Sequence, residues 1–239
     1  MASTSFSTIL NTLSPDLVIY DVGPPWAQST ALSFNIPAVQ LMTTGATGQP
    51  PCNFMLYNTC RELEGKYIDH LPVIGEKKVV PVGPLVQGIV DDENEHSEII
   101  QWLDNKGEYS TLFVSFGSEY FMSKEEIEEI AHGLELSMVN FIWVVRFPNG
   151  EKVELEEALP KGFVDRLGER GLVVDGWAPQ ARILTHSSIG GFVSHCGWNS
   201  VLEGLKFGVP IVAIPMQWRR LVWLWRSTET SMEDSTETR

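Results

Sequence analysis

The stretch from Gly171 to Ile214 limits the fold of this chain more strongly than any other feature of its sequence. Three short apolar runs bounded by turn residues predict strands, at 171–174, 189–194 and 211–214. Helices are predicted between them, at 181–186 and 201–207. The run 189–194 has no polar alternation, which is typical of a strand buried on both faces of a parallel sheet. The stretch therefore predicts an α/β fold built on a parallel sheet.

The same alternation of strands and helices continues on both sides of an acidic, aperiodic segment at 86–97. Ahead of this segment we expect helices at 4–13, at 26–34 and from Arg61 on, and strands at 17–20, 38–42 and 54–59. Behind it we expect strands at 111–116 and 141–146, and helices at 124–136 and 162–168. The acidic segment is interpreted as a linker, which predicts two Rossmann-type domains.

Composition excludes several classes of function. The 239 residues carry a formal net charge of −14, which argues against nucleic acid and anionic membranes as partners. No apolar run approaches the about 20 residues that span a bilayer, and the first residues do not have the pattern of a signal peptide. Three cysteines without metal-ligand spacing suggest free thiols in a reducing compartment. A cytoplasmic protein without integral membrane association is therefore expected.

Polar residues gather where the predicted strand 189–194 ends and the next helix begins. In an open parallel sheet, ligands lie at the carboxyl ends of the strands, and a helix N-terminus at that edge attracts phosphate. The crossing carries an imidazole, an amide and a hydroxyl, from His195, Asn199 and Ser200. Gly197 lets the backbone approach an anion closely. Asn199 or Ser200 is expected to be the N-cap of the helix.

Further residues complete a predicted site for a nucleoside diphosphate. Glu203 offers a carboxylate, the group that typically binds a ribose diol. Trp177 offers a ring on which a flat base can stack. Gly117 and Ser118 follow the predicted strand 111–116 and are candidates for a phosphate-binding loop. Diphosphate, ribose and base are each matched by a suitable group.

Several of these residues also have a purely structural interpretation. Ser200 and Glu203 have the spacing of a capping box, which needs no ligand. His195 can be a hydrogen-bonded core histidine, and Cys196 can be either a thiol nucleophile or, more commonly, a buried inert residue. Gly117 and Ser118 can form a plain turn. The conjunction of these residues at fixed spacing, and no single one of them, favours the nucleotide site.

The motifs in this stretch are W-A-P-Q at 177–180, H-x-x-x-G-x-F-x-x-H-C-G-W-N-S at 186–200, Glu203, and G-V-P at 208–210. Together they resemble the signature box of plant family-1 UDP-glycosyltransferases, almost position for position from Trp177 to Pro215. The resemblance implies a GT-B-like fold of two Rossmann-type domains. It also implies transfer of a hexose, expected to be glucose, from a UDP-sugar donor to a hydroxyl of a small plant metabolite, with inversion and without a further cofactor.

The resemblance also assigns roles to individual residues. Uracil and ribose would be held by Trp177, Ala178 and Gln180, and the ribose hydroxyls by Glu203. The diphosphate would be bound by His195, Asn199 and Ser200 and touched by Ser118, with Trp198 near the sugar. No metal is required if His195 and the helix dipole balance the charge of the phosphates.

The strand predicted at 17–20 ends in Asp21. In the family, such an aspartate orients and charge-stabilises a catalytic histidine, so the run P-D-L-V-I-Y-D implies this role for Asp21; an aspartate that caps the next helix is the alternative. The family's histidine is expected before this aspartate, whereas all five histidines of the chain follow it, at 70, 96, 132, 186 and 195. After Pro215, Arg219 and Arg220 stand where the family has an acidic residue and Gln that hold the sugar.

These departures are interpreted as truncation at both ends, with both domains incomplete. We expect a remnant of an acceptor-binding domain at 1–85, the linker at 86–97, a partial UDP-sugar-binding domain at 98–217, and an aberrant, disordered tail at 218–239. The tail back-translates, in a shifted reading frame, into a sequence typical of the family, which suggests a frame shift. The chain as it stands is therefore expected to lack full activity.

The segments 61–67 and 79–85 look most like the branch of the family that adds a sugar to an existing glycoside. The acceptor is therefore expected to be a glycoside or its aglycone, and the protein a monomer. A non-catalytic nucleotide-binding remnant or regulatory partner is the alternative from a different class of function. An NAD-dependent oxidoreductase is disfavoured because G-x-G-x-x-G is absent.

Overall fold

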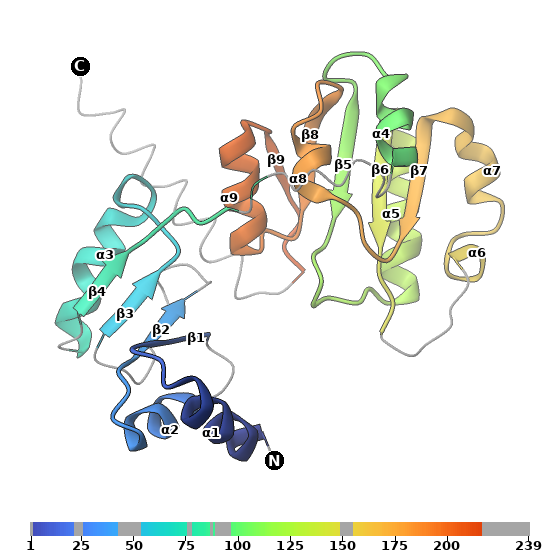
Figure 1. Ribbon diagram of the computed structural model, residues 1–239. Coiled ribbons are helices and arrows are strands. Elements are labelled where there is room, and N and C mark those ends of the chain that lie inside the picture. Colours follow the sequence, from blue (N-terminus) through green and yellow to red (C-terminus); the bar gives the residue numbers. More distant parts are fainter. Residues whose placement is uncertain are drawn as a thin grey trace, which may run out of the picture. The chain divides into compact units, whose positions relative to one another are not determined.

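The computed structural model describes residues 2–21, 26–42, 54–75, 78–86, 88, 97–148 and 155–216. The chain divides into two compact units, Met1–Val86 and Gln87–Arg239. Each unit is built on its own parallel sheet (Figure 1). Along the described ranges, no helix is both long enough and apolar enough to cross a bilayer.

The first unit contains a four-stranded sheet in the order β1-β2-β3-β4. Its strands are β1 (Val18–Tyr20), β2 (Ala38–Met42), β3 (Phe54–Tyr57) and β4 (Lys78–Pro81), and its helices are α1 (Ala2–Leu13), α2 (Ala27–Ser33) and α3 (Arg61–Gly75). Leu10 of α1 and Ala31 of α2 are buried together with Ile36. Tyr57 of β3 is buried with Ile68 of α3 in a second cluster. Neighbouring strands pair in parallel throughout, so all their carboxyl ends lie at one edge.

The sheet of the second unit has the order β7-β6-β5-β8-β9. Its strands are β5 (Thr111–Ser115), β6 (Asn140–Val145), β7 (Gly171–Asp175), β8 (Ile189–Ser194) and β9 (Ile211–Ala213). In sequence order, the first strand of this sheet, β5, lies in the centre, and β6 and β7 follow on one side of it. The chain then returns, and β8 and β9 lie on the other side of β5. All four pairings are parallel. The direction of winding therefore changes between β5 and β8, and the carboxyl edge at this switch point is where such sheets bind ligands.

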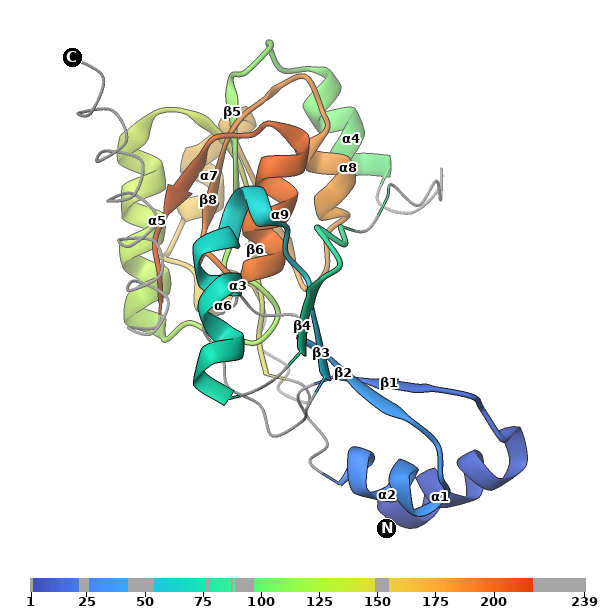
Figure 2. The same ribbon diagram turned by 90° about the vertical axis from the view of Figure 1, so that its left-hand side faces the viewer.

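Helices cover both faces of this sheet (Figure 2). They are α4 (Ser97–Asp104), α5 (Lys124–Ser137), α6 (Leu155–Ala158), α7 (Phe163–Leu167), the short 3₁₀ helix η1 (Gly168–Arg170), α8 (Gln180–Leu184) and α9 (Trp198–Phe207). Side chains of a strand alternate between faces, so Val114 and Trp143 pack with α5, α6 and α7, whereas Phe113 and Ile142 pack with α4 and α8. The two apolar layers bury both faces of the sheet and so hold the strands, and the edge formed by their carboxyl ends, in place.

The fold class predicted from the sequence, α/β with two parallel sheets, is confirmed. The strands β2 and β8 have the predicted bounds, and the ends of the other predicted strands lie within two residues of the observed ones. Helix α4 was not predicted, because it begins at Ser97, the last residue of the acidic segment that was interpreted as a linker. Ile99 and Leu103, one turn apart in α4, are almost fully buried and attach the helix to the sheet. Most of segment 86–97 and all of the tail 218–239 lie outside the described residues.

Candidate functional site

Two loops meet at the switch point of the second sheet. Gly117 follows β5, and His195 follows β8. A Cβ atom added to Gly117 would lie 2.5 Å from both Cε1 and Nε2 of His195, so the imidazole ring rests directly against the glycine backbone. Gly117 has φ +82°, a conformation that suits glycine. The two residues, 78 positions apart in the sequence, are brought together as a pair that no larger residue at 117 can reproduce.

The turn between β8 and α9 is made by Cys196. Its φ of +60° is left-handed, which is uncommon for a residue other than glycine. The Cys196 N–H donates to Ser194 Oγ at 3.1 Å, and its thiol is buried and directed to the Ser194 carbonyl oxygen, with Sγ 3.5 Å away. A buried thiol held in this way does not suit a nucleophile, so the geometry favours the inert interpretation of Cys196.

This turn shifts the start of α9. The N-cap predicted from the sequence was Asn199 or Ser200, and this is wrong: Gly197 is the N-cap, with φ −58° and ψ 141°. The capping-box interpretation of Ser200 and Glu203 also fails, because Ser200 already lies in the first turn and the N-cap receives no side-chain hydrogen bond. The physical reason is that Cys196 turns the chain early, so Trp198 is already helical.

The early start places the predicted anion-binding residues in the first turn of α9. The hydrogen bond from Val201 N to Gly197 O, at 3.0 Å, opens the helical ladder, so the backbone N–H groups of residues 198–200 are not used by it. Asn199 is exposed there, whereas Trp198 and Ser200 are buried. A ten-residue helix thus directs the positive end of its dipole to the switch point, beside His195.

A second pair of predicted residues lies on α8 and α9. The side-chain amide of Gln180, the first residue of α8, donates through Nε2 to Oε2 of Glu203 in the middle of α9. Just before α8, Ala178 is buried, whereas Trp177 is 50% exposed. The ring of Trp177 therefore has a surface to offer a planar ligand. The hydrogen bond orients one carboxylate oxygen of Glu203 and leaves the other to a ligand hydroxyl.

The remaining predicted residues are not part of these two pairs. Ser118 is exposed on the β5–α5 loop, one residue beyond Gly117. Asp21 is exposed and directly follows β1, at the carboxyl end of a strand, as predicted. It belongs to the first unit, so it is described apart from the residues of the second.

Sequence reasoning missed a polar network on the β5–α5 loop. Tyr120 Oη donates to Glu126 Oε1 at 2.5 Å, and Ser123 N donates to Glu126 Oε2 at 2.8 Å. The hydrogen bond to Glu126, with smaller effects of burial and of the carboxylate charge, raises the pKa of the Tyr120 phenol above its ordinary value. The spacing Ser123-x-x-Glu126 is a capping-box signal and could have located half of this network.

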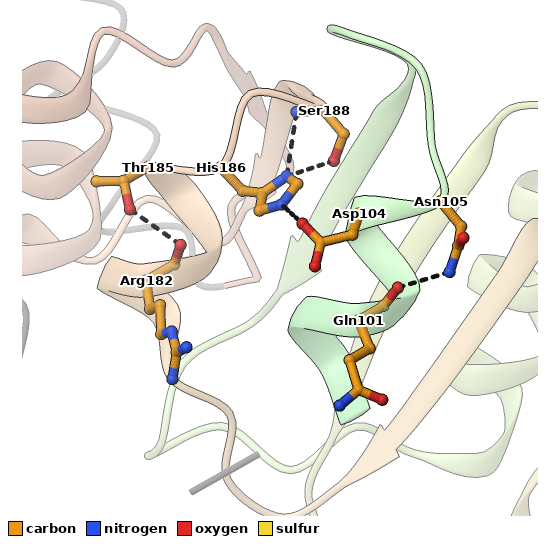
Figure 3. Close-up of polar contacts among 7 residues, drawn as sticks. All are labelled: Gln101, Asp104, Asn105, Arg182, Thr185, His186 and Ser188. Carbon is orange, nitrogen blue, oxygen red and sulfur yellow. Dashed lines mark hydrogen bonds and ion pairs between the residues drawn. The ribbon is translucent and has the colours of Figure 1, made fainter. Parts of the chain in front are cut away.

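Another polar cluster lies at the opposite, amino-terminal edge of the sheet (Figure 3). His186 Nε2 is 3.1 Å from Asp104 Oδ1 at the end of α4, and His186 Nδ1 is 2.9 Å from Ser188 Oγ. The backbone N–H of Ser188 also donates to Nδ1, at 3.2 Å. The three residue types are those of a catalytic triad, but Ser188 is only 1% exposed. The cluster is therefore a structural clip that joins α4 to the loop ahead of β8.

This clip predicts a stability effect. His186→Ala removes the group that accepts the Ser188 N–H and contacts Asp104, so the free energy of unfolding should fall by about 1–2 kcal/mol. Asp104→Ala should cost less than about 1 kcal/mol, because the Asp104 side chain is 65% exposed. Denaturant unfolding followed by tryptophan fluorescence measures both. His132→Ala, on the exposed surface of α5, is the matched control; equal stability of His186→Ala and His132→Ala would contradict the clip.

Among the residues that the structure describes, no group of three or more His, Cys, Asp and Glu side chains is placed to hold a metal ion. The predicted residues thus form two sets: an imidazole, an amide and a hydroxyl at the N-terminus of α9, and a carboxylate farther along α9 with an indole in the segment ahead of α8. The first set suits a diphosphate, and the second suits a nucleoside.

Comparison with known proteins places the same segments in one family. The profile described as "UDP-glucoronosyl and UDP-glucosyl transferase" matches residues 77–218. A mogroside IIIx synthase of Siraitia grosvenorii is 50% identical and shares 90% of this chain and 60% of its own length. A beta-D-glucosyl crocetin beta-1,6-glucosyltransferase of Gardenia jasminoides is 43% identical, over 90% of this chain and 61% of its own. The chain thus spans about 60% of the length of these relatives.

The chain is also shorter inside the matched region. The alignment with the mogroside IIIx synthase runs over 271 positions, whereas 90% of 239 residues is about 215, so the relative has roughly 55 residues there that this chain lacks. Among solved structures, a UGT transferase from Siraitia grosvenorii in complex with UDP has a TM-score of 0.75 and 27% identity. That likeness covers 92% of this chain and 65% of the other.

Proposed function

The chain belongs to the UDP-glucuronosyl and UDP-glucosyl transferase family, and from this premise we propose that its second unit binds a UDP-sugar at the switch point between β5 and β8. The observation that carries the proposal is the contact of Gly117 with His195, at the point where the β5 loop meets the N-terminus of α9. A flat imidazole, an approachable backbone and a helix N-terminus are the groups that an enzyme uses to hold a diphosphate without a metal.

The donor is proposed to lie across the two pairs of residues. The diphosphate lies between Gly117 and Ser118 on one side and the segment His195–Ser200 on the other, including Gly197 and Asn199, with Trp198 near the sugar. The ribose is held by Gln180 and Glu203, whose hydrogen bond to each other supports this assignment. The uracil stacks on Trp177 above Ala178, which agrees with the exposed ring of the one and the burial of the other.

We propose that the reaction of the whole protein is the transfer of a hexose from this UDP-sugar to a hydroxyl of a small plant metabolite, with inversion at the anomeric carbon. In that reaction a general base removes the proton of the acceptor, and Asp21 orients that base. The N-terminus of α9 and His195 stabilise the departing UDP. The name of one relative, a glucosyltransferase that acts on beta-D-glucosyl crocetin, supports an acceptor that already carries a sugar. Another relative is named for the synthesis of a glycoside, mogroside IIIx.

A cytoplasmic monomer is part of the same proposal. The absence of a disulfide at Cys60 and Cys196, together with the acidic composition, supports a reducing, aqueous compartment. A non-transferring, nucleotide-binding role is favoured by one observation, since Arg219 and Arg220 stand where the resemblance implies an acidic residue and a Gln that hold the sugar. An assay with UDP-glucose and glycoside acceptors separates the two roles, because only the transferase releases UDP in step with glycosylated product.

Calorimetric titration tests the binding step. The chain should bind UDP, and His195→Ala should weaken that binding about 10- to 100-fold, the value of one hydrogen bond to a charged group. Uridine, which lacks the diphosphate, should bind His195→Ala and the unaltered chain equally well. His132→Ala on α5 is the matched control and should change neither affinity. A chain that does not bind UDP, or whose UDP affinity is the same with His195→Ala, would contradict the proposed site.

A further inference from the structure

The β5–α5 loop is braced by a single carboxylate. One oxygen of Glu126 accepts the phenol of Tyr120 at 2.5 Å, and the other accepts the backbone N–H of Ser123 at 2.8 Å. The N–H of Glu126 in turn donates to Ser123 Oγ at 3.2 Å, which completes a capping box at the start of α5. Both oxygens are therefore used to fix the loop, and one of them holds Tyr120, a residue outside the helix.

These contacts of Tyr120, Ser123 and Glu126, here called the brace, lie close in the sequence to the residues proposed to contact the diphosphate. At one end of the loop, Phe116 is 3% exposed and Gly117 lies against His195. At the other end, Ser123 is the N-cap of α5. Ser118 and Glu119, between these ends, are exposed, and Tyr120 comes next. A loop fixed at both ends presents its backbone and the Ser118 hydroxyl in one conformation, which lowers the ordering entropy that a ligand must overcome.

We infer that Tyr120, held by Glu126, is a positioning residue for the diphosphate of the donor. The inference rests on the proposed function and deepens it, because it names a residue that acts through Gly117 and Ser118 without contacting the ligand. An alternative reading is that the brace only stabilises α5. The two readings differ in what they predict for different parts of the ligand.

The base and ribose contacts lie on other elements. Trp177 and Gln180 belong to the segment before and at the start of α8, and Glu203 belongs to α9. Loosening the β5–α5 loop therefore changes binding of the diphosphate and leaves binding of the nucleoside unchanged. A loss of general stability has no such selectivity, because it acts on every ligand of the unit alike.

The experiment compares UDP and uridine by calorimetry on the full chain. Tyr120→Phe removes a single hydroxyl, and we expect it to weaken UDP binding about three- to tenfold while uridine affinity stays within about twofold. Tyr109→Phe is the matched control, since Tyr109 is 76% exposed and precedes β5 at the opposite edge of the sheet. It should change neither affinity.

A second variant removes the other partner of the brace. Glu126→Gln replaces one of the two carboxylate oxygens with an NH₂ group. Because NH₂ donates and does not accept, the side chain can no longer accept from Tyr120 with one oxygen and from Ser123 with the other. We therefore expect the same loss specific to UDP. Glu129→Gln, at an exposed acidic position farther along α5, is its control. Thermal melting of each variant tests whether the fold is retained.

The outcomes separate this inference from the function on which it rests. The positioning role is overturned if Tyr120→Phe leaves the UDP affinity unchanged, or if it weakens the binding of UDP and uridine equally. If His195→Ala still weakens UDP binding, the proposed function stands without a positioning role for Tyr120. If the unaltered chain does not bind UDP, both the proposed function and the positioning role are overturned.

Discussion

Gly117→Ala is expected to weaken UDP binding about 100-fold or more, which corresponds to two or more tenfold steps of about 1.4 kcal/mol each. The added Cβ would lie 2.5 Å from Cε1 and Nε2 of His195, so the imidazole must leave its place against the backbone. Alanine at φ +82° also strains the loop, by about 1–2 kcal/mol. The variant therefore loses both the imidazole and the close approach of the loop. Titration with UDP measures the loss, and titration with uridine should show little of it.

The matched control for this prediction is Gly208→Ala. Gly208, the C-cap of α9, has φ +68°, so alanine is strained there to a similar extent. A Cβ at Gly208 would meet no heavy atom within 4 Å. Gly208→Ala should therefore lower stability and leave UDP affinity unchanged. Similar UDP affinities for the two variants would show that backbone strain alone, and not the contact with His195, explains the effect.

Glu203→Ala is expected to weaken the binding of UDP and uridine alike, about 10- to 100-fold, because a hydrogen bond from a ribose hydroxyl to a charged group contributes about 1.5–3 kcal/mol. This pattern differs from that of Gly117→Ala, since the ribose is present in both ligands. Gln180→Ala should have a smaller effect, because Gln180 acts partly by orienting the Glu203 carboxylate. The double variant should therefore bind little worse than Glu203→Ala alone. Calorimetry with both ligands measures all three variants.

Glu129→Ala, at an exposed position of α5, is the control for the loss of a carboxylate. It should not alter either affinity, because the charge is solvated and lies on a helix that carries none of the proposed ribose contacts. A Glu203→Ala variant that loses UDP but keeps uridine would place Glu203 at the phosphates. Additive losses in the double variant would show that Gln180 and Glu203 act independently.

The sequence predicted the strands of the second unit well because each is a short apolar run between turn residues. Ile189–Ser194 is buried at five of its six positions, which is why its lack of polar alternation was informative. The predicted start of a helix was less accurate. The start of α9 was wrong because the left-handed turn at Cys196 depends on its buried contacts with Ser194, and local preference does not reveal such a turn at a cysteine.

The candidate site was predicted as a set of residue types and not as an arrangement. The pairing of Gly117 with His195 requires that β5 and β8 be neighbours, and this follows from the change of winding direction and not from the spacing of the residues. The Gln180–Glu203 hydrogen bond likewise depends on how α8 packs beside α9. Tyr120 was missed because its role depends on Glu126, whose capping motif is a common feature of helices and does not by itself suggest a ligand.

Amide hydrogen exchange of the full chain, with and without UDP, tests the central claim most directly. The N–H groups in the first turn of α9 are not used by the helical ladder, so a bound diphosphate should slow their exchange. We expect slower exchange in residues 195–200 and 116–118, and a smaller change at 177–180. We expect no change at the opposite edge of the sheet, in residues 105–110 and 185–188. Unchanged exchange at 195–200 in saturating UDP, or slower exchange at the opposite edge alone, would contradict the claim that this switch point is the nucleotide site.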